Sequence, residues 1–248
     1  ADLAALRKAG RLVAETFARL AEMIRPGVRL HELDQMATDF LKSRGAQPLY
    51  KGYRGNPPSH PPFPGTICAS VNDEICHGLP DRRALSAGDV VGIDIGLKYK
   101  GWCGDACVTY AVGTITPEAQ QLLRVTDECL YTGIEAAQPG RHLGDIGAAI
   151  QAHAEAHGYT VVREWGGHGL GRNLHEPPSV SHTGPAGRGP LLRPGMVFTI
   201  EPMINAGKAE WKLLQDGWTV VTLDGQLSAQ FEHTIAITEN GAEILSKL

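Results

Sequence analysis

The sequence predicts an α+β fold built from two similar halves that face each other across a pseudo-twofold axis. Two observations support this prediction: stretches with helical spacing of apolar residues alternate with strand-like stretches, and one pattern occurs twice. The landmarks of the first half that recur at a constant offset of 113 are Pro26, Gly27, Leu30, Leu33 and Gly45. We therefore infer a duplication within one domain, 1–248, with halves at about 1–113 and 114–248.

Four helices are predicted, over about 2–24, 30–45, 117–137 and 143–158. Each range carries apolar residues at helical spacing. Pro26 and Gly27 end the first helix, because neither residue continues a helix well. The third helix has Thr116 as its N-cap, Pro117 in its first turn and Glu118 near the positive end of the helix dipole.

The stretch from Gly88 to Val108 reads as two strands joined by a short turn. If the turn is centred on Tyr99 and Lys100, antiparallel pairing places Asp94 directly opposite Asp105. Opposed side chains lie about 5 Å apart at Cβ, so two carboxylates among apolar neighbours need a shared proton or a cation. The hairpin alone leaves open that one of these aspartates points into solvent.

The second half supplies two more acids from similar positions. Glu201 follows the glycine that begins its strand by six residues, as Asp94 does, and Glu232 lies on a later strand, as Asp105 does. Four anions in one core need positive charge, and no lysine or arginine stands at matching strand positions. We expect divalent cations, and carboxylates with one or two imidazoles suit Mn, Fe, Co or Zn. His168, flanked by glycines, has an accessible ring and is a candidate ligand.

Two further segments are interpreted from their residue types. Residues 55–65 hold five prolines in eleven positions, so we expect a stiff rim loop rather than a site for a proline-recognition partner. His175 is followed by two prolines and by Ser179 at the fourth position, which excludes a metalloprotease helix and favours a hydrogen-bond donor to substrate. Five other histidines receive no role: His60, His142, His153, His157 and His182.

Composition limits the class of protein. The 248 residues include 23 Lys plus Arg and 27 Asp plus Glu, with no dense basic run and no apolar run of membrane-spanning length. We expect a cytoplasmic protein with no membrane and no sequence-specific nucleic-acid partner. The five cysteines include no Cys-x-x-Cys, which favours reduced thiols. Cys103 and Cys107 lack the second pair that a zinc site needs, so their expected role is packing.

Six motifs combine these residues. They are Ser70-Val71-Asn72 through His77-Gly78, Gly92-Ile93-Asp94, Gly104-Asp105, Gly167-His168-Gly169-Leu170-Gly171, Thr199-Ile200-Glu201-Pro202-Met203 and Ala229-Gln230-Phe231-Glu232-His233-Thr234. Each motif alone is weak, but as a set they are highly specific, and the chain resembles type I methionine aminopeptidase over nearly its whole length. The resemblance implies the pseudo-twofold pita-bread (creatinase/aminopeptidase) fold, an antiparallel β-sheet with helices packed on its outer face. It also implies a metallo-exopeptidase that removes the initiator methionine from nascent proteins when the second residue is small.

The resemblance also implies roles for individual residues. Two divalent metal ions would be bound by Asp94, Asp105, His168, Glu201 and Glu232. Asp105 and Glu232 would bridge the two ions, which can together activate a shared water and polarise a carbonyl. Glu201 would also shuttle the proton of that water. His77 and His175 would hold the substrate and the developing oxyanion.

The substrate's methionine side chain would contact Tyr53, Cys68 and Trp218, with Phe63 beside them, because a thioether packs well against aromatic rings. Two departures from the bacterial pattern touch this pocket rather than the metal ligands. The proline-rich loop is an insertion, and Leu174 stands where an aromatic residue is common.

By the same resemblance, a monovalent cation would bind near Asn72 and Ser228, and a monomer would associate transiently with the ribosome. Two alternatives remain open. An Xaa-Pro aminopeptidase or prolidase would share the fold. Such enzymes, however, typically carry a separate N-terminal domain and a different sequence motif after the fourth acid, which is Glu232 here. A catalytically dead binding module would tend to lose metal ligands, whereas all five stand here.

Overall fold

The computed structural model describes residues 2–55 and 58–248 and contains four helices within those ranges. They are α1 (Asp2–Met23), α2 (Leu30–Ser43), α3 (Pro117–Ala136) and α4 (Leu143–Ala156). All four predicted helices are confirmed, with ends that shift by one or two residues. The N-cap of α3 is also as expected, because the Thr116 hydroxyl accepts a hydrogen bond from the Ala119 N–H at 3.2 Å.

The largest sheet is antiparallel and runs through both halves. Its strands are β1 (Gln47–Pro48), β2 (Cys68–Val71), β4 (Val90–Tyr99), β5 (Trp102–Ala111), β7 (Gly167–Gly169), β8 (Glu176–Val180), β9 (Val197–Ile200), β14 (Glu232–Thr238) and β15 (Gly241–Ile244). Their order is β1-β4-β5-β14-β9-β7-β8, with β2 also paired to β4 and β15 to β14. The two halves therefore join where β5 pairs with β14.

Two small antiparallel sheets flank this one. The first contains β6 (Thr160–Val161), β10 (Met203–Asn205) and β13 (Ser228–Gln230), and the second contains β3 (Glu74–Cys76), β11 (Trp211–Leu213) and β12 (Val220–Thr222). The second sheet crosses between the halves, because β3 belongs to the first and β12 to the second.

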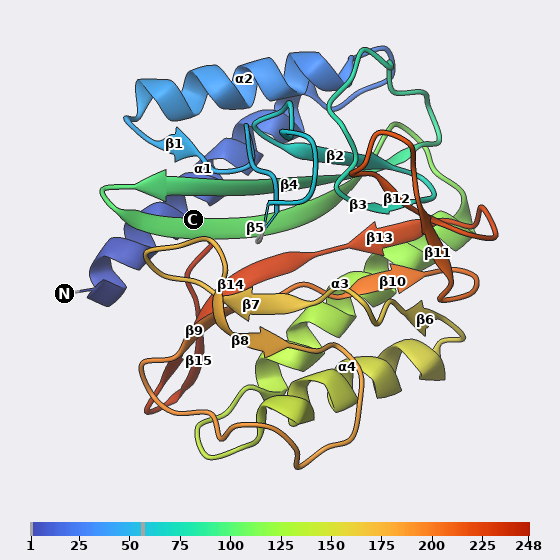
Figure 1. Cartoon of the computed structure of the whole chain (residues 1–248). Coiled ribbons are helices and arrows are strands. Elements are labelled where there is room, and N and C mark those ends of the chain that lie inside the picture. Colours follow the sequence, from blue (N-terminus) through green and yellow to red (C-terminus); the bar gives the residue numbers. More distant parts are fainter. Residues whose placement is uncertain (1, 56–57) are drawn as a thin grey trace.

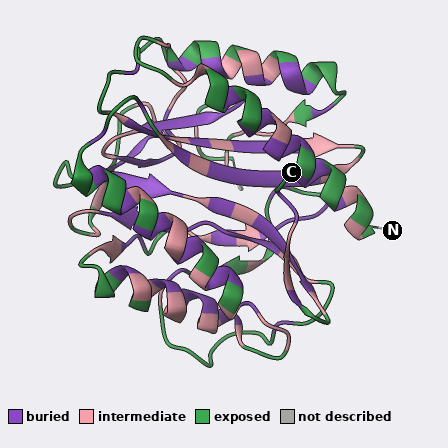
Figure 2. Ribbon diagram, turned by 180° about the vertical axis from the view of Figure 1, so that it is seen from behind, coloured by how far each residue is buried: buried purple, intermediate pink, exposed green. Residues whose placement is uncertain are grey.

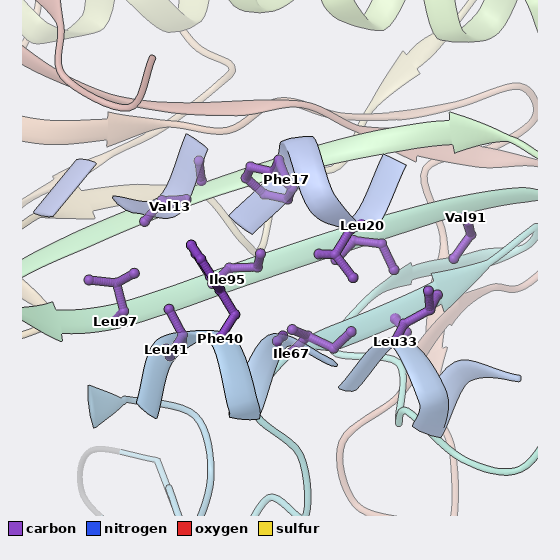
Figure 3. Packing of buried hydrophobic residues seen from close by; sticks show 14 of the residues in the cluster. Val13, Phe17, Leu20, Leu33, Phe40, Leu41, Ile67, Val91, Ile95 and Leu97 are labelled. Carbon is purple, nitrogen blue, oxygen red and sulfur yellow. The ribbon is translucent and has the colours of Figure 1, made fainter. Parts of the chain in front are cut away.

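Each half has its own apolar core. Helices α1 and α2 pack on the strands of the first half, and α3 and α4 pack on those of the second (Figure 1). The first core includes Phe17, Leu20, Leu33, Leu41 and Ile95 (Figure 3). The second core includes Leu122, Leu130, Ile146, Ile150 and Phe198. Burying one such side chain contributes about 1.5–3 kcal/mol, so each helix pair is held to its strands mainly by these contacts. The predicted α+β arrangement, with helices on the outer face, is confirmed.

The predicted register of the first hairpin is wrong by two residues. Gly96 lies opposite Asp105, and Asp94 lies opposite Cys107. The turn is centred on Lys100 and Gly101 rather than one residue earlier, and both have positive φ, at 49° and 82°. A two-residue hairpin turn favours that conformation, and glycine adopts it at no steric cost. Asp94 and Asp105 are therefore diagonal neighbours on one face of the sheet.

The molecular surface is formed by the outward sides of the helices and by loops. Figure 2 shows strands that are mostly buried behind helices that alternate between buried and exposed positions. The proline-rich loop is exposed at Pro62 and Pro64, as expected of a rim loop, while Phe63 between them is buried. Asn56 and Pro57 of this loop lie outside the described residues.

The five cysteines are buried free thiols, which confirms the prediction of reduced cysteines. Among residues 2–55 and 58–248, no helix has the length and apolar character that crossing a bilayer requires.

Candidate active site

One cavity of about 710 Å³ collects the residues that the sequence singled out for chemistry and substrate contact. Its lining includes Tyr53, Phe63, Cys68, His77, Asp94, Asp105, His168, His175, Glu201, Trp218 and Glu232. Asn72 and Ser228 are also brought together, since the Ser228 N–H donates to the Asn72 carbonyl oxygen at 2.9 Å, but they do not line this cavity. Both halves of the chain contribute walls.

The four acids reach the cavity from the central strands of the sheet. Asp94 lies on β4 and Asp105 on β5, while Glu232 is the first residue of β14 and Glu201 follows the last residue of β9. Asp105 is 3% exposed, Glu232 2% and Glu201 9%. The alternative that Asp105 points into solvent is thereby excluded.

His168 faces two of these acids. Its Nε2 atom lies 3.5 Å from Asp105 Oδ2 and 3.7 Å from Glu201 Oε1. Its Nδ1 atom lies 3.0 Å from the Gly169 carbonyl oxygen, which accepts a hydrogen bond from a protonated Nδ1. A hydrogen bond of this kind is the usual way in which proteins orient a histidine and leave Nε2 free for a metal.

Thr199 ties the histidine to the neighbouring glutamate. Its hydroxyl donates to Glu201 Oε1 at 2.7 Å and accepts a hydrogen bond from the His168 backbone N–H at 2.9 Å. The Glu201 backbone N–H in turn donates to Nε2 of His182, a residue that is 1% exposed. Glu201 is therefore fixed at both its side chain and its backbone.

Burial and mutual repulsion make the acids reluctant to ionise. Burial raises the pKa of Asp94 well above its ordinary value, and the charge of Asp105 raises it further. Burial, followed by the charges of Asp105 and Glu201, does the same to the pKa of Glu232. Burial raises the pKa of Glu201 to about 7, although the nearby His168 opposes this shift. Without added positive charge, the cluster holds protons near neutral pH.

His168 behaves in the opposite way. Burial by itself lowers its pKa, but the hydrogen bond to Asp105 and the charge of Glu201 outweigh burial and raise the pKa to about 9. The imidazolium thus supplies the positive charge that the acids lack. A metal ion in this place would provide that charge instead and would take the proton's position on Nε2.

The donor set fits a divalent metal. Ligand atoms of Asp105, His168 and Glu232 all lie within 4.8 Å of one another. Oε1 of Glu232 is buried and has no hydrogen-bond partner among the described residues, which is costly for a carboxylate unless an ion binds it. Within residues 2–55 and 58–248, none of the four acids pairs with a lysine or arginine. Carboxylates with one imidazole suit Mn, Fe, Co or Zn.

The opposite wall of the cavity is aromatic and apolar. The ring centroid of Trp218 lies 5.3 Å from that of Phe63 and 6.2 Å from that of Tyr53, and Cys68 is buried beside them. The proline-rich loop braces this wall, because the Trp218 indole N–H donates to the Pro61 carbonyl oxygen at 2.9 Å. The buried side chain of Leu174 also lines the cavity.

Two neutral histidines lie beside the aromatic wall: His77 next to Trp218 and His175 next to Tyr53. Burial, with a smaller contribution from His175, lowers the pKa of His77 to about 4. Burial, then the charge of His168, lowers the pKa of His175 to about 4. Nδ1 of His175 lies 3.1 Å from the Tyr53 hydroxyl. Both rings are therefore uncharged hydrogen-bonding groups near neutral pH.

The sequence did not identify four residues that support this site. Thr199 and His182 hold Glu201, Gln230 reaches Glu201 Oε2 at 3.4 Å, and the Tyr50 hydroxyl contacts both Asp94 and Asp105. Thr199 and Gln230 lie within the motifs that contain Glu201 and Glu232, so their positions in the sequence could have indicated that they support the site. Tyr50 and His182 carry no such signal.

Comparison with known proteins gives a consistent result. Residues 4–239 match Metallopeptidase family M24. The chain is 50% identical to "Methionine aminopeptidase 1" of Bacillus subtilis, covering 100% of this chain and 97% of that one. It is 44% identical to "Methionine aminopeptidase" of Escherichia coli K12, covering 99% of this chain and 91% of that one.

Solved structures of methionine aminopeptidases are also similar to this chain. The crystal structure of methionine aminopeptidase from Rickettsia prowazekii superposes with a TM-score of 0.95 at 43% identity, covering 99% of this chain and 96% of that chain. A prolidase from Pyrococcus horikoshii superposes with a TM-score of 0.78 at 22% identity, covering 99% of this chain and 62% of that one, and this likeness shows the fold alone.

Proposed function

The chain belongs to metallopeptidase family M24 as a methionine aminopeptidase, and from this premise we propose that the cavity between its halves is the active site. In this proposal it removes the initiator methionine from nascent polypeptides whose second residue is small. The observation that carries the proposal is that five potential metal ligands and an aromatic pocket line one cavity.

Five residues would hold two divalent ions, with Asp105 and Glu232 shared between them. One oxygen of Asp105 faces His168, and the other contacts the Tyr50 hydroxyl, which also contacts Asp94. The two oxygens of Asp105 therefore point toward different members of the cluster, which supports the assignment of this carboxylate as shared. The chemistry that such ions supply is Lewis acidity, which activates water and polarises a carbonyl. The free, buried Oε1 of Glu232 supports its assignment as the second shared ligand.

Glu201 is the group proposed to move a proton. Its carboxylate lines the cavity beside His168, and from there it would accept a proton from the attacking water and return that proton to the leaving amine. The hydrogen bond from Thr199 holds its Oε1 in place throughout, so the carboxylate need not reorient between the two transfers.

His175 and His77 are proposed to bind the reacting peptide group. Both are uncharged near neutral pH, so each can donate one hydrogen bond without introducing a competing positive charge beside the metal ligands. A donor aimed at the carbonyl oxygen is worth most when negative charge develops there. The contact between Tyr53 and Nδ1 of His175 fixes the orientation of that ring.

The aromatic wall is proposed to receive the methionine side chain. Tyr53, Phe63 and Trp218 offer ring faces and edges, and Cys68 closes the pocket. A flexible thioether gains from such contacts, while a charged side chain would lose its hydration there. Leu174 completes the wall with an aliphatic surface in place of a ring.

The test begins with purified protein stripped of metal by a chelator and reloaded with Co, Mn, Fe or Zn. We expect metal-dependent release of methionine from Met-Ala-Ser, little release from Met-Leu-Ser, and no cleavage of Ala-Pro-Ala. Full activity after metal removal, or equal cleavage of the two methionine peptides, would contradict the proposal. Cleavage of Ala-Pro-Ala would favour a prolidase-type specificity, and failure to retain any metal would favour a binding module.

Four further features stay predictions from the sequence and its family. They are a monovalent cation beside Asn72 and Ser228, transient association with the ribosome, a monomeric state and a cytoplasmic location. The organisation as one catalytic domain, 1–248, is proposed on the same basis.

A further inference from the structure

A second group of potential metal ligands lies between α3 and α4, outside the cavity. It consists of Glu128 on α3, His153 in the last turn of α4 and His157, which caps the end of that helix. One ligand atom from each residue lies within 4.8 Å of the other two. None of the three lines the active-site cavity, so the proposed peptidase chemistry does not account for this group.

The packing of the two helices brings these residues together. Helices α3 and α4 lie side by side (Figure 1), and the buried Cys129 thiol lies 3.8 Å from the Ile150 carbonyl oxygen. Glu128 is the neighbour of Cys129, while His153 and His157 follow Ile150 by three and seven residues. That spacing keeps side chains on one side of a helix. The three ligands are therefore placed by the contact between the helices.

The distances suit a tetrahedral ion. Nε2 of His153 lies 3.0 Å from Oε2 of Glu128. A zinc ion with nitrogen and oxygen ligands at about 2.0–2.2 Å holds neighbouring ligand atoms about 3.3–3.5 Å apart. Small side-chain rotations would therefore enclose an ion. It would take the place of the proton through which Nε2 now contacts the carboxylate.

Two neighbouring contacts orient the ligands. Nδ1 of His157 lies 2.9 Å from the His153 carbonyl oxygen. A carbonyl oxygen only accepts, so this hydrogen bond places the ring proton on Nδ1 and leaves the lone pair of Nε2 for a metal. Arg124 donates to Oε1 of Glu128 at 2.7 Å, which leaves Oε2 for the ion. The charge of Arg124 opposes a cation, but the negative end of the α4 dipole offsets it.

We propose that Glu128, His153 and His157 form a zinc site that ties the end of α4 to α3, separate from the ions of the active site. Two imidazoles favour zinc over magnesium or calcium, which prefer oxygen ligands. Three protein ligands leave the fourth tetrahedral position to water.

Equilibrium dialysis of the purified protein against a zinc buffer, followed by metal analysis, tests the proposal without an activity assay. His153→Gln, His157→Gln and Glu128→Gln each remove one ligand, which should weaken this site at least tenfold. At the free zinc concentration that just fills the sites of the unmodified protein, we expect each variant to bind about one zinc ion fewer per chain. Circular dichroism checks that the variants are folded.

His31→Gln is the matched control, because it removes an exposed histidine from α2, in the other half of the molecule. It should bind as much zinc as the unmodified protein. Anomalous scattering at the zinc edge, from crystals of the zinc-loaded protein, should place an ion between Glu128, His153 and His157.

An undiminished zinc content in any of the three ligand variants would overturn the inference, because each ligand is needed to complete the site. The absence of an anomalous peak between α3 and α4 would overturn it as well. The test compares variants that leave the cavity intact, so its outcome does not depend on whether the cavity itself holds metal.

Discussion

His168 and Asp105 face each other across the join between the two halves of the sheet, with Nε2 and Oδ2 separated by 3.5 Å. His168 comes from β7 and Asp105 from β5, and β14 and β9 lie between those strands in the sheet order. The pair therefore depends on the correct assembly of four strands. It lies where we expect a metal to bind, because Glu232 brings a third ligand atom close to the pair.

Replacing Asp105 with Asn removes a ligand that both proposed ions share. Because even residues that only orient a metal ligand cost 10–100-fold, turnover should fall by at least about 100-fold, and bound metal should fall with it. Metal content by plasma emission and release of methionine from Met-Ala-Ser measure the two effects. Asp127→Asn on α3 is the control, since this aspartate lies outside the cavity lining. Near-normal activity of Asp105→Asn would rule out the assignment.

Thr199→Val keeps the β-branched shape but removes the hydroxyl that holds both Glu201 and the His168 backbone. We expect kcat to fall about 10–100-fold, because the Glu201 carboxylate, which we propose carries the proton, loses its fixed position. KM should change little, since Thr199 does not line the cavity. Thr199→Ser restores the hydroxyl and should recover most of the loss. If valine and serine behave alike, the hydroxyl has no part in positioning Glu201.

His175→Ala should lower kcat more than it changes KM. The reason is that a donor to the developing oxyanion contributes mainly in the transition state. Steady-state kinetics on Met-Ala-Ser separate the two constants. Tyr53→Phe removes the group that orients His175 and should show a smaller loss of the same kind. An increase in KM alone would mean that His175 serves ground-state binding.

His182 should make the protein sensitive to acid. Burial lowers its pKa from 6.5 to about 3, so below pH 6.5 the unfolded chain takes up a proton that the folded protein does not. As the pH is lowered below 6.5, the free energy of unfolding therefore decreases by about 1.4 kcal/mol per pH unit until the pKa of the folded state is reached.

His182→Gln keeps an acceptor for the Glu201 N–H but does not titrate. Between about pH 7 and pH 5, urea unfolding of the metal-free protein should show the unmodified chain losing about 2 kcal/mol more than this variant. His31→Gln, which replaces an exposed histidine by the same residue type, is the matched control. Parallel stability curves for the unmodified chain and His182→Gln would show that His182 titrates normally.

Much of this structure follows from local patterns. Some features depend only on residues close together in the chain and could therefore be predicted from the sequence. They are the periodicity of α1 to α4, the cap at Thr116 and the strand positions of Asp94 and Asp105. The duplication then indicates that the two pairs of acids meet, and the cavity lining agrees.

Other features depend on choices that sequence spacing does not determine. A hairpin centred on Lys100 and Gly101 differs from one centred a residue earlier only by which positions adopt positive φ. The approach of Tyr50 to Asp94 depends on the space above Gly96, created by a strand pairing that is distant in sequence. Contacts of this kind become visible only when the strands are placed in three dimensions.

The join between β5 and β14 also limits when the protein becomes an enzyme. Asp105 is made early, but Glu232 belongs to a strand synthesised more than a hundred residues later. A growing chain that ends before β14 lacks Glu232, one of the five proposed metal ligands. If these ligands hold the metal as proposed, a copy of the protein that is still being translated cannot trim its own N-terminus before β14 has been made.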